Sequence, residues 1–327
     1  MTSSRNTVRR HSAPDGIVVV DKPQGWTSHD VVSKMRGLAA TRKVGHAGTL
    51  DPMATGVLVI GIGKATKLLH YIVGADKDYD TTIRLGFSTD TEDAEGTSLS
   101  ETSSAPQRLE LEDLQRAADT LTGDIMQVPS AVSAIKIDGK RAYDRVRSGE
   151  DVVIPARPVH VSRFHITGIE KASSQYGDVW DVHASVTVSS GTYVRALGRD
   201  LARALGTEGH LTMLRRTRVG GYSIDTAAPL EALQQQVEQH QVIDVLPLAQ
   251  AASASFPVRH LSEDEVIALG YGKRLSPQHQ SLEDVEESTA SEVTQLYAGA
   301  SSHGELIALL KDDGRKAQPV VVFAPRQ

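Results

Sequence analysis

Apolar and polar residues alternate along the chain in short blocks, and their spacing predicts both strands and helices. Apolar or alternating runs predict strands at Gly16–Val20, Gly56–Ile62, Asp80–Leu85, Val159–Ile166 and Val179–Val188. Apolar residues three and four positions apart predict helices at Ala65–Val73, Leu111–Leu121 and Thr192–Leu205. The elements do not follow a strict βαβ rhythm. This favours an α+β fold, with a mixed, mostly antiparallel sheet and flanking helices, over a Rossmann fold.

Capping and helix-breaking residues mark the ends of two helices. Thr27 and Asp30 have the three-residue spacing of a capping pair, so a helix should begin near Thr27. Gly37 should end this helix, and Gly206 should end the helix that begins near Thr192.

Stretches without apolar periodicity divide the chain. Residues 88–107 are rich in Ser, Thr, Asp and Glu and predict a long polar loop. Ala249–Ser255 contains only Ala, Gln and Ser and predicts a domain boundary. The elements expected after it indicate a small β-rich barrel: a helix at Ser262–Leu269, a polar insert at Ser276–Ser291, and strands at Leu306–Leu310 and Pro319–Phe323. We expect a disordered tail at 1–14, a main domain at 15–250 and a C-terminal domain at 251–327.

Composition excludes several classes of protein. With 327 residues, 39% of them hydrophobic and 23% charged, the chain has the composition of a globular protein and room for one large core and a smaller one. It contains no cysteine, which rules out disulfides, thiolate metal sites and cysteine nucleophiles and suits a reducing, cytoplasmic setting. No run approaches the roughly 20 apolar residues of a membrane span. Residues 1–14 carry three arginines without a following apolar stretch, so we expect no signal peptide.

The net charge of −6 is unevenly distributed. Residues 1–79 hold 11 Lys and Arg against 6 Asp and Glu, and residues 125–220 hold 14 against 9. Residues 80–124 and 221–327 are each acidic, with a net charge of −8. An anionic polymer responds to the local field, so RNA remains an admissible partner of the two basic segments. Ordinary variation along a solvated surface explains the pattern equally well.

The densest chemical signal is Gly45–Val57, with the sequence GHAGTLDPMATGV. Its glycines indicate a tightly turned backbone, and Asp51 lies in a loop just before an apolar strand, a common way to present a catalytic group. Taken alone, Asp51 could equally cap a turn, because Asp-Pro is a favoured turn dipeptide. His46 alone is more typical of a packing or surface histidine.

Six blocks in the same order resemble the TruB family of tRNA pseudouridine-55 synthases. Gly45–Val57 resembles the family's signature. The other five blocks, which with it cover roughly residues 16–220, are Asp21–Ser28, Lys77–Asp80, Gln127–Lys136, Gly191–Leu197 and His210–Thr217. The resemblance implies a pseudouridine synthase fold with a C-terminal PUA-like domain. That domain matches only loosely, and its acidic balance leaves its contact with RNA open.

The resemblance also implies roles for individual residues. Asp51 matches the aspartate that acts on the ribose or the uracil as the glycosidic bond breaks, and Arg195 matches its arginine partner. Tyr79 matches the tyrosine that stacks on the flipped uracil. His46 matches a histidine that enters the T-loop where the base has left. Tyr193 and Leu214 match residues that line the base pocket.

Physical chemistry supports these roles. The target atoms are hidden in a folded loop, so the nucleotide must be flipped out, at a cost of a few kcal/mol. An aromatic ring such as Tyr79 repays part of this cost by stacking. An arginine within about 4–6 Å favours the ionised form of a carboxylate. No phosphate-binding Gly-Lys-Ser/Thr loop and no zinc-spaced ligands occur, so we expect no cofactor and no metal.

A basic cluster surrounds a predicted short helix and consists of Lys136, Lys140, Arg141, Arg145 and Arg147. It could hold phosphates, with Lys136 as the expected substrate-binding residue, or form an ordinary solvated helix face. The same two interpretations apply to Arg215, Arg216 and Arg218. The block after Gln127 lacks the second proline and the aromatic residue of many family members, which leaves its contacts open.

The sequence thus predicts a cytoplasmic isomerase that converts one uridine of the tRNA T-loop, acting on the T-arm as a monomer without membrane, DNA or protein partners. Two alternatives remain. One is a guide-dependent RNA pseudouridine synthase, which usually carries basic extensions that this chain lacks. The other is a tRNA-folding chaperone without modification activity, against which the presence of Asp51, Tyr79 and Arg195 argues.

Overall fold

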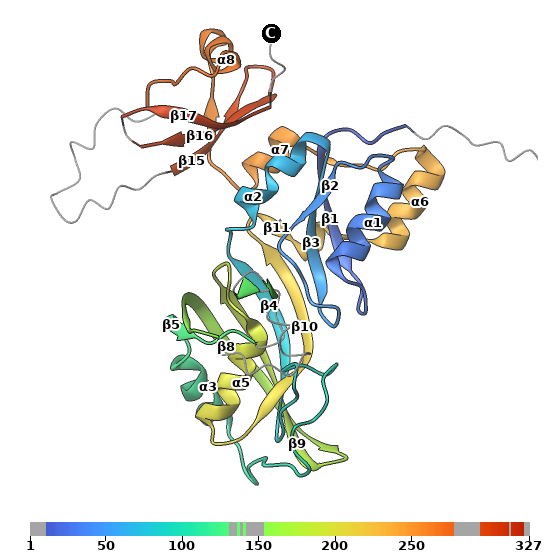
Figure 1. Cartoon of the computed structure of the whole chain (residues 1–327), viewed down its shortest axis with the longest axis vertical. Coiled ribbons are helices and arrows are strands. Elements are labelled where there is room, and N and C mark those ends of the chain that lie inside the picture. Colours follow the sequence, from blue (N-terminus) through green and yellow to red (C-terminus); the bar gives the residue numbers. More distant parts are fainter. Residues whose placement is uncertain are drawn as a thin grey trace, which may run out of the picture.

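The chain is described by a computed structural model that covers residues 11–130, 136–137, 140–141, 154–277, 295–313 and 315–323. Figure 1 shows three regions along the long axis. A small C-terminal sheet lies at one end, a group of strands and helices from the N-terminal segment lies in the middle, and strands β8 and β9 reach the other end. Two long strands, β4 and β10, connect the second and third regions.

One mostly antiparallel sheet forms the main body. Its order in the described part of the chain is β12-β1-β3-β10-β4-β9-β8-β5, and β2, β11 and β13 pair at its margins. The strands of the main path are β12 (Ala228–Pro229), β1 (Gly16–Lys22), β3 (Thr55–Ile62), β10 (Gly209–Val219), β4 (Lys77–Leu85), β9 (Gly177–Val188), β8 (Arg157–Ser174) and β5 (Gly123–Gln127). The marginal strands are β2 (Val44–Ala47), β11 (Tyr222–Ser223) and β13 (Leu246–Pro247). Among the described strands of this sheet, only β1–β12 and β10–β3 pair in parallel, which confirms the predicted sheet type.

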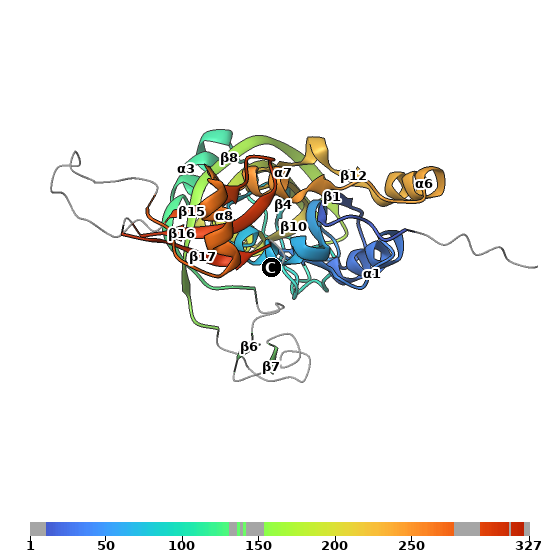
Figure 2. The ribbon, with the colours of Figure 1, turned by 90° about the horizontal axis from the view of Figure 1, so that it is seen from above.

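Helices cover both faces of the N-terminal strands. Alternate residues of β1 and β3 enter two different cores: Val18 and Leu58 join one, and Val19 and Val59 join the other. This two-sided burial explains why both strands are continuously apolar. The first core is closed by α1 (Ser28–Leu38) and α6 (Leu230–His240), which lie next to each other in Figures 1 and 2. The second is closed by the 3₁₀ helix η1 (Gly63–Lys67), α2 (Leu69–Ile72) and α7 (Leu248–Ser253).

A third core lies under the longer strands. Helices α3 (Leu111–Asp119) and α5 (Val194–Ala204) pack on β4, β8, β9 and β10. The apolar stripe predicted for the second of these helices is buried at Val194, Leu197 and Leu201. This stripe packs α5 on β10, the strand that pairs with both β3 and β4.

The C-terminal region forms a separate four-stranded sheet in the order β14-β15-β16-β17. Its strands are β14 (Val258–His260), β15 (Gln295–Ala300), β16 (Leu306–Asp312) and β17 (Ala317–Val322), with helix α8 (Glu263–Gly270) packed on them. Leu306, Leu309 and Phe323 join the core of α2 and α7, so this sheet is packed on the main body. A small β-rich C-terminal unit is thereby confirmed.

Several expected element boundaries are wrong. Helix α1 continues through Gly37 to Leu38, because the turn comes at Ala40, which has φ +49°. The helix expected at Ala65–Val73 is a 3₁₀ helix followed by a four-residue α-helix. The stretch Ala249–Ser255 lies largely in α7, since its alanines are small enough to pack closely on β1 and β15. Residues 1–10 and 278–294 lie outside the described residues, so the expected tail and most of the polar insert do too, and the domain limits 1–14, 15–250 and 251–327 stay predictions.

Candidate active site

Asp51 lies in the loop between β2 and β3, and two neighbouring segments hold this loop. Ser28, in the first turn of α1, accepts a hydrogen bond from the Leu50 N–H (2.9 Å), and its hydroxyl donates to the Leu50 carbonyl (3.2 Å). Leu50 and Met53 are buried on either side. The side chain of Asp51 itself is 38% exposed. A rigid backbone thus presents an accessible carboxylate.

Arg216 is a second anchor of the same loop. This side chain of β10 is fully buried and donates to the carbonyl oxygens of Gly48 (3.1 Å), Thr49 (3.3 Å) and Val57 (2.8 Å). Parallel pairing of β10 with β3 places Arg216 opposite Gly56, whose φ is +99°. A buried guanidinium satisfied by backbone carbonyls ties the start and the end of the Asp51 loop to the central strand.

Arg195 is the partner of Asp51. It lies in the first turn of α5, and its Nε is 2.9 Å from Oδ2 of Asp51. Its Nη1 donates to the carbonyl oxygen of Thr91 (2.6 Å) and lies 3.5 Å from Oδ2 of Asp93. Only 6% of the Arg195 side chain is exposed. Thr91 and Asp93 therefore hold the guanidinium while its Nε contacts the more exposed Asp51.

Asp93 completes this ion-pair group, and the sequence interpretation missed it. Its side chain is buried and accepts hydrogen bonds from the Thr91 hydroxyl (2.6 Å) and the Glu95 N–H (3.0 Å). Burial, with the charges of Asp93 and Asp51, raises the pKa of Glu95, so this acid also lies within the field of the site. The segment 88–107 was interpreted only as a polar loop. Its Asp-x-Glu-Asp-x-Glu run was the available signal.

The acidic loop is anchored on α5. Arg199, one turn after Arg195, donates to Glu92 (2.6 Å) and to the Val128 carbonyl (2.8 Å), and the Ser130 hydroxyl also donates to Glu92. The loop and the helix thus form one unit, so that the position of Asp93 relative to Arg195 is fixed.

Gln127 sets the start of α5. Its buried amide donates to the Tyr193 carbonyl (3.1 Å) and accepts from the Tyr193 N–H (2.8 Å). Tyr193 is the N-cap residue of the helix, two positions before Arg195. A reciprocal pair of hydrogen bonds fixes the backbone of a predicted pocket residue and, through it, the helix that carries the arginine.

Tyr79 and Leu214 lie on adjacent strands, β4 and β10, and pair opposite Arg216 and Thr81 respectively. Both side chains are largely buried, and both belong to the cluster that contains Leu50 and Met53, which flank Asp51. The structure thus brings Asp51, Arg195, Tyr79 and Leu214 into one region, with Tyr193 at its edge.

Lys22 is a buried cation next to the Asp51 loop that the sequence interpretation did not select. Its Nζ donates to the carbonyl oxygens of Pro23 (3.0 Å), Trp26 (2.6 Å) and Pro52 (3.2 Å). Burial lowers its pKa to about 8, although the charge of Asp51 opposes the shift. This side chain holds the segment around Trp26 against the residue that follows Asp51.

His46 lies on β2 and is half-buried. Burial, followed by the charge of Arg216, lowers its pKa, while the backbone of Gly48 opposes the shift. His46 is therefore neutral at pH 7. A neutral imidazole can enter a folded RNA loop without the cost of removing a charge from water.

The basic residues predicted to hold phosphates fall into two groups. Lys136–Ile137 (β6) and Lys140–Arg141 (β7) form a two-stranded ladder where a helix was expected, while Arg145, Arg147 and the side chain of Lys136 lie outside the described part. Arg215 forms a bidentate pair with Asp21, and Arg218 with Asp78. Arg216 is buried, whereas the paired side chains of Arg215 and Arg218 stay about one third exposed.

Among the described residues, no three His, Asp or Glu side chains are grouped so that they could hold a metal ion. Within the same residues, no helix has the length and apolar character needed to cross a bilayer.

Comparisons with known proteins show the family of the chain. Residues 36–194 match the N-terminal domain of TruB family pseudouridylate synthases. Residues 195–250 match the tRNA pseudouridylate synthase B C-terminal domain, and residues 256–324 match the tRNA pseudouridine synthase II C-terminal domain. The tRNA pseudouridine synthase B of Arthrobacter sp. (strain FB24) is 54% identical over 95% of this chain and 97% of its own length. The tRNA pseudouridine synthase B of Thermobifida fusca (strain YX) is 49% identical over 95% of this chain and 99% of its own length.

Among solved structures, the chain resembles one in the crystal structure of a Cbf5-Nop10-Gar1 complex. The TM-score is 0.69 at 23% identity, over 98% of this chain and 93% of the other. At this identity the likeness shows the shared pseudouridine synthase fold. The tRNA synthase relatives are about 50% identical and cover almost the whole sequence. The chain therefore belongs to the TruB family of tRNA pseudouridine synthases.

Proposed function

We propose that this enzyme converts the uridine at position 55 of the tRNA T-loop to pseudouridine, with Asp51 as its essential carboxylate. The observation that carries the proposal is the contact of 2.9 Å between the half-exposed Asp51 and the buried Arg195. An accessible acid held by a fixed cation is what a reaction at a sugar–base linkage requires.

The reaction rearranges one nucleotide and needs no second substrate. The N1–C1′ bond breaks, the uracil turns, and C5 joins C1′; the proton leaves C5 and N1 gains one. Asp51 acts on the ribose or the uracil as the first bond breaks. Arg195 holds the carboxylate in place, and Asp93 and Thr91 hold Arg195.

The base reaches Asp51 only after it leaves the stack of the loop. Tyr79, Tyr193 and Leu214 supply the surface that receives it, and Tyr79 stacks on the uracil. His46 enters the space that the base vacates, as a neutral group. Lys136 and its basic neighbours in sequence hold phosphates of the T-arm.

The chain acts as a monomer in the cytoplasm, without cofactor, guide RNA or protein partner. Relatives of similar length that carry the tRNA synthase name at 54% and 49% identity support this choice over a guide-dependent enzyme. Intact catalytic residues support it over a chaperone that only folds tRNA.

The test uses the purified chain alone with an unmodified tRNA transcript. Chemical mapping should find a single pseudouridine, at position 55. Asp51→Asn should lower the single-turnover rate by on the order of 10³-fold or more and leave RNA binding nearly unchanged. Asp178→Asn is the matched control, because that carboxylate is 73% exposed at the far hairpin of β8 and β9. Product that forms only after a guide RNA is added, or an active Asp51→Asn protein, would refute the proposal.

A further inference from the structure

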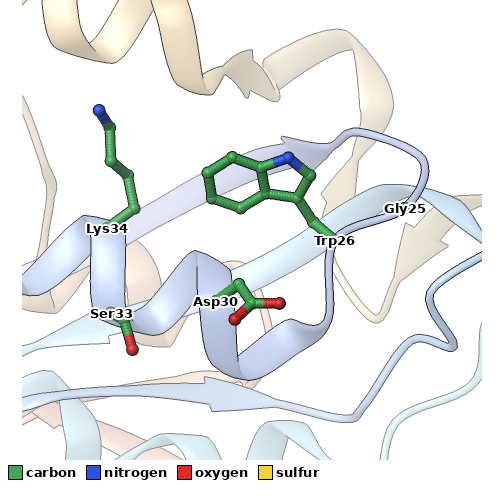
Figure 3. Close-up of a pocket in the computed structure, with 5 residues that line it drawn as sticks. All are labelled: Gly25, Trp26, Asp30, Ser33 and Lys34. Atoms are coloured by element: carbon green, nitrogen blue, oxygen red, sulfur yellow. The ribbon is translucent and has the colours of Figure 1, made fainter.

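Packed side chains hold the start of α5, the helix that carries Arg195, and one of them is Gln127, the last residue of β5. The hollow of about 410 Å³ in Figure 3 lies apart from this contact. All its lining residues belong to α1 or to the turn before it, and they are Gly25, Trp26, Asp30, Ser33 and Lys34. The position of Arg195 therefore depends on buried contacts such as that of Gln127.

Gln127 is a polar residue at a position where its strand calls for an apolar one. Alternate residues of a strand point to the same face, and Ile125, two positions earlier, packs against the core under α3 and α5. Gln127 is only 1% exposed. Burial of an amide costs free energy unless its donor and its acceptor find partners. An apolar side chain would avoid this cost, so what a glutamine adds here is its two hydrogen bonds.

Both hydrogen bonds go to the residue at which α5 begins. The N-cap residue is Tyr193, and its side chain makes no capping hydrogen bond. Its carbonyl oxygen accepts from the Leu197 N–H (3.1 Å), as a helix requires, and also from the Gln127 amide (3.1 Å). Its N–H donates to the same amide (2.8 Å). Gln127 thus fixes both backbone groups at the start of a helix that lacks a side-chain cap.

The fixed backbone leads directly to the reacting groups. Arg195 follows Tyr193 by two positions, and its Nε contacts Asp51 (2.9 Å). The side chain of Tyr193 is expected to line the base pocket. One buried amide therefore holds the backbone of a pocket residue and that of the arginine. An error of about 1 Å in the placement of such groups can cost on the order of 10²-fold in rate.

From these contacts we infer that Gln127 is a positioning residue for pseudouridine formation, which rests on the proposed roles of Asp51 and Arg195. Its amide holds the start of α5 so that Arg195 meets Asp51 and Tyr193 meets the flipped base. Gln127 acts through these two residues and touches none of the reacting atoms.

Gln127→Met tests the role of the amide, because it keeps the length of the side chain and removes both hydrogen bonds. In single-turnover kinetics with a tRNA transcript, the maximal rate should fall by about 10- to 100-fold, since the reacting groups are misplaced. Kd for a T-arm stem-loop, measured with Asp51→Asn also present, should stay within about threefold, because phosphate contacts elsewhere supply most of the binding.

Gln115→Met is the matched control. The amide of Gln115 makes the same reciprocal pair of hydrogen bonds, donating to the Phe164 carbonyl (2.9 Å) and accepting from the Ile166 N–H (3.0 Å). It ties α3 to β8 and makes no contact with the start of α5. Gln115→Met should also lose stability in urea unfolding, but its rate should stay within about twofold of wild type.

Gln127→Glu gives a readout that a loss of stability alone would not move. A carboxylate accepts from the Tyr193 N–H but cannot donate to the Tyr193 carbonyl, whereas a protonated carboxyl does both. Burial favours the neutral form, although the charge of Arg199, whose Nη2 donates to the Val128 carbonyl, opposes it. At pH 6 the rate of Gln127→Glu should exceed that of Gln127→Met by about fivefold or more, and this advantage should shrink by pH 8.

All rates are measured where circular dichroism shows every variant fully folded. A Gln127→Met rate equal to that of Gln115→Met overturns the inference, and so does a Gln127→Glu advantage that is absent at pH 6 or does not change with pH. The proposed function fails separately. If Asp51→Asn keeps the wild-type rate, that function is wrong whatever Gln127 does. If Asp51→Asn is inactive and Gln127→Met matches its control, only the role of Gln127 is wrong.

Discussion

Buried positive charge surrounds the Asp51 loop. Lys22, Lys77 and Arg216 are each at least 93% buried, and their described hydrogen bonds run to backbone carbonyls. Burial and the charge of Arg216 lower the pKa of both lysines, while the charges of Asp51 on Lys22 and of Asp76 on Lys77 oppose the shift. This field attracts a polyanion towards Asp51 even though the whole chain is acidic.

Arg195→Lys tests how the site uses its guanidinium. A lysine keeps the charge but cannot contact Asp51, Thr91 and Asp93 together, since it lacks the planar fork of donors. We expect kcat to fall by about 10- to 100-fold with a smaller change in KM, because the carboxylate is misplaced. Single-turnover kinetics measure this. Arg108→Lys, at a side chain that is 86% exposed, is the control. An Arg195→Lys enzyme within twofold of wild type would contradict the assignment.

Lys77 gives a dependence of stability on pH. Burial and the charge of Arg216 lower its pKa from 10.5 to about 8, so the folded chain loses this proton at lower pH than the unfolded chain. Between about pH 8 and pH 10.5 the unfolded chain binds more protons, and the free energy of unfolding therefore rises with pH. Over the whole window the lysine contributes roughly 3 kcal/mol to this rise.

Urea unfolding at pH 7.5 and 9.5 tests this effect. Lys77→Met should reduce the rise in the free energy of unfolding but not abolish it, because the pKa of Lys22 is lowered to about 8 as well. The change also costs stability at both pH values, since the carbonyls of Val73 and Ala75 lose their donor. Lys171→Met, at a 53% exposed side chain, should keep the full slope. An unchanged slope in Lys77→Met would show that another group causes the rise.

At the scale of elements, the junction of β3 and β10 depends on a close backbone approach. Gly56 has φ +99°, and an added Cβ would stand within 3.0 Å of three backbone atoms of Arg216. Only glycine fits there, since the position combines a left-handed backbone with no space for a side chain. The chain thereby brings Arg216 under the Asp51 loop.

Gly56→Ala should consequently cost more stability than the same change elsewhere. Gly123 is the matched control: its φ is +91°, but no atom lies within 4 Å of the added Cβ. We expect Gly123→Ala to lower the free energy of unfolding by about 1–2 kcal/mol, the cost of the backbone conformation. Gly56→Ala should lower it by about 3 kcal/mol or more, because the strands must also separate. Equal losses of unfolding free energy in the two variants, measured by urea unfolding, would show that the backbones of Gly56 and Arg216 do not approach closely.

The sequence predicts an element well where burial matches a simple period. The apolar runs of β1, β3 and β9 and the stripe of α5 are examples. Strand β10 was missed, because Arg215, Arg216 and Arg218 make it look polar. Their charges are satisfied by Asp21, Asp78 and backbone carbonyls, partners far away in sequence that no local pattern reveals.

The same limit applies to the site. The pairing of Asp51 with Arg195 was expected from family resemblance. The contact of Asp93 with Arg195 and that of Gln127 with Tyr193 were identified only from the fold. Both residues act through tertiary contacts with residues more than 60 positions away. The sequence around a polar loop or a single glutamine does not show which distant residues they contact.

On the scale of the whole molecule, separate segments converge on one loop. The N-terminal unit supplies Lys22 and Ser28, the central strands supply Tyr79 and Arg216, and α5 supplies Arg195. The C-terminal sheet packs on the far side of the N-terminal strands, through Leu306, Leu309 and Phe323. It completes their core without contributing a described side chain to the Asp51 group.

The central claim is that Asp51 alone among the carboxylates starts the rearrangement of a single tRNA uridine. Release of the C5 hydrogen reports that rearrangement directly, because this atom leaves when C5 joins C1′. With tRNA labelled by tritium at C5 of its uridines, the purified wild-type chain should release one equivalent, from position 55, and Asp51→Asn should release none. Release by Asp51→Asn at a rate near that of wild type would contradict the account.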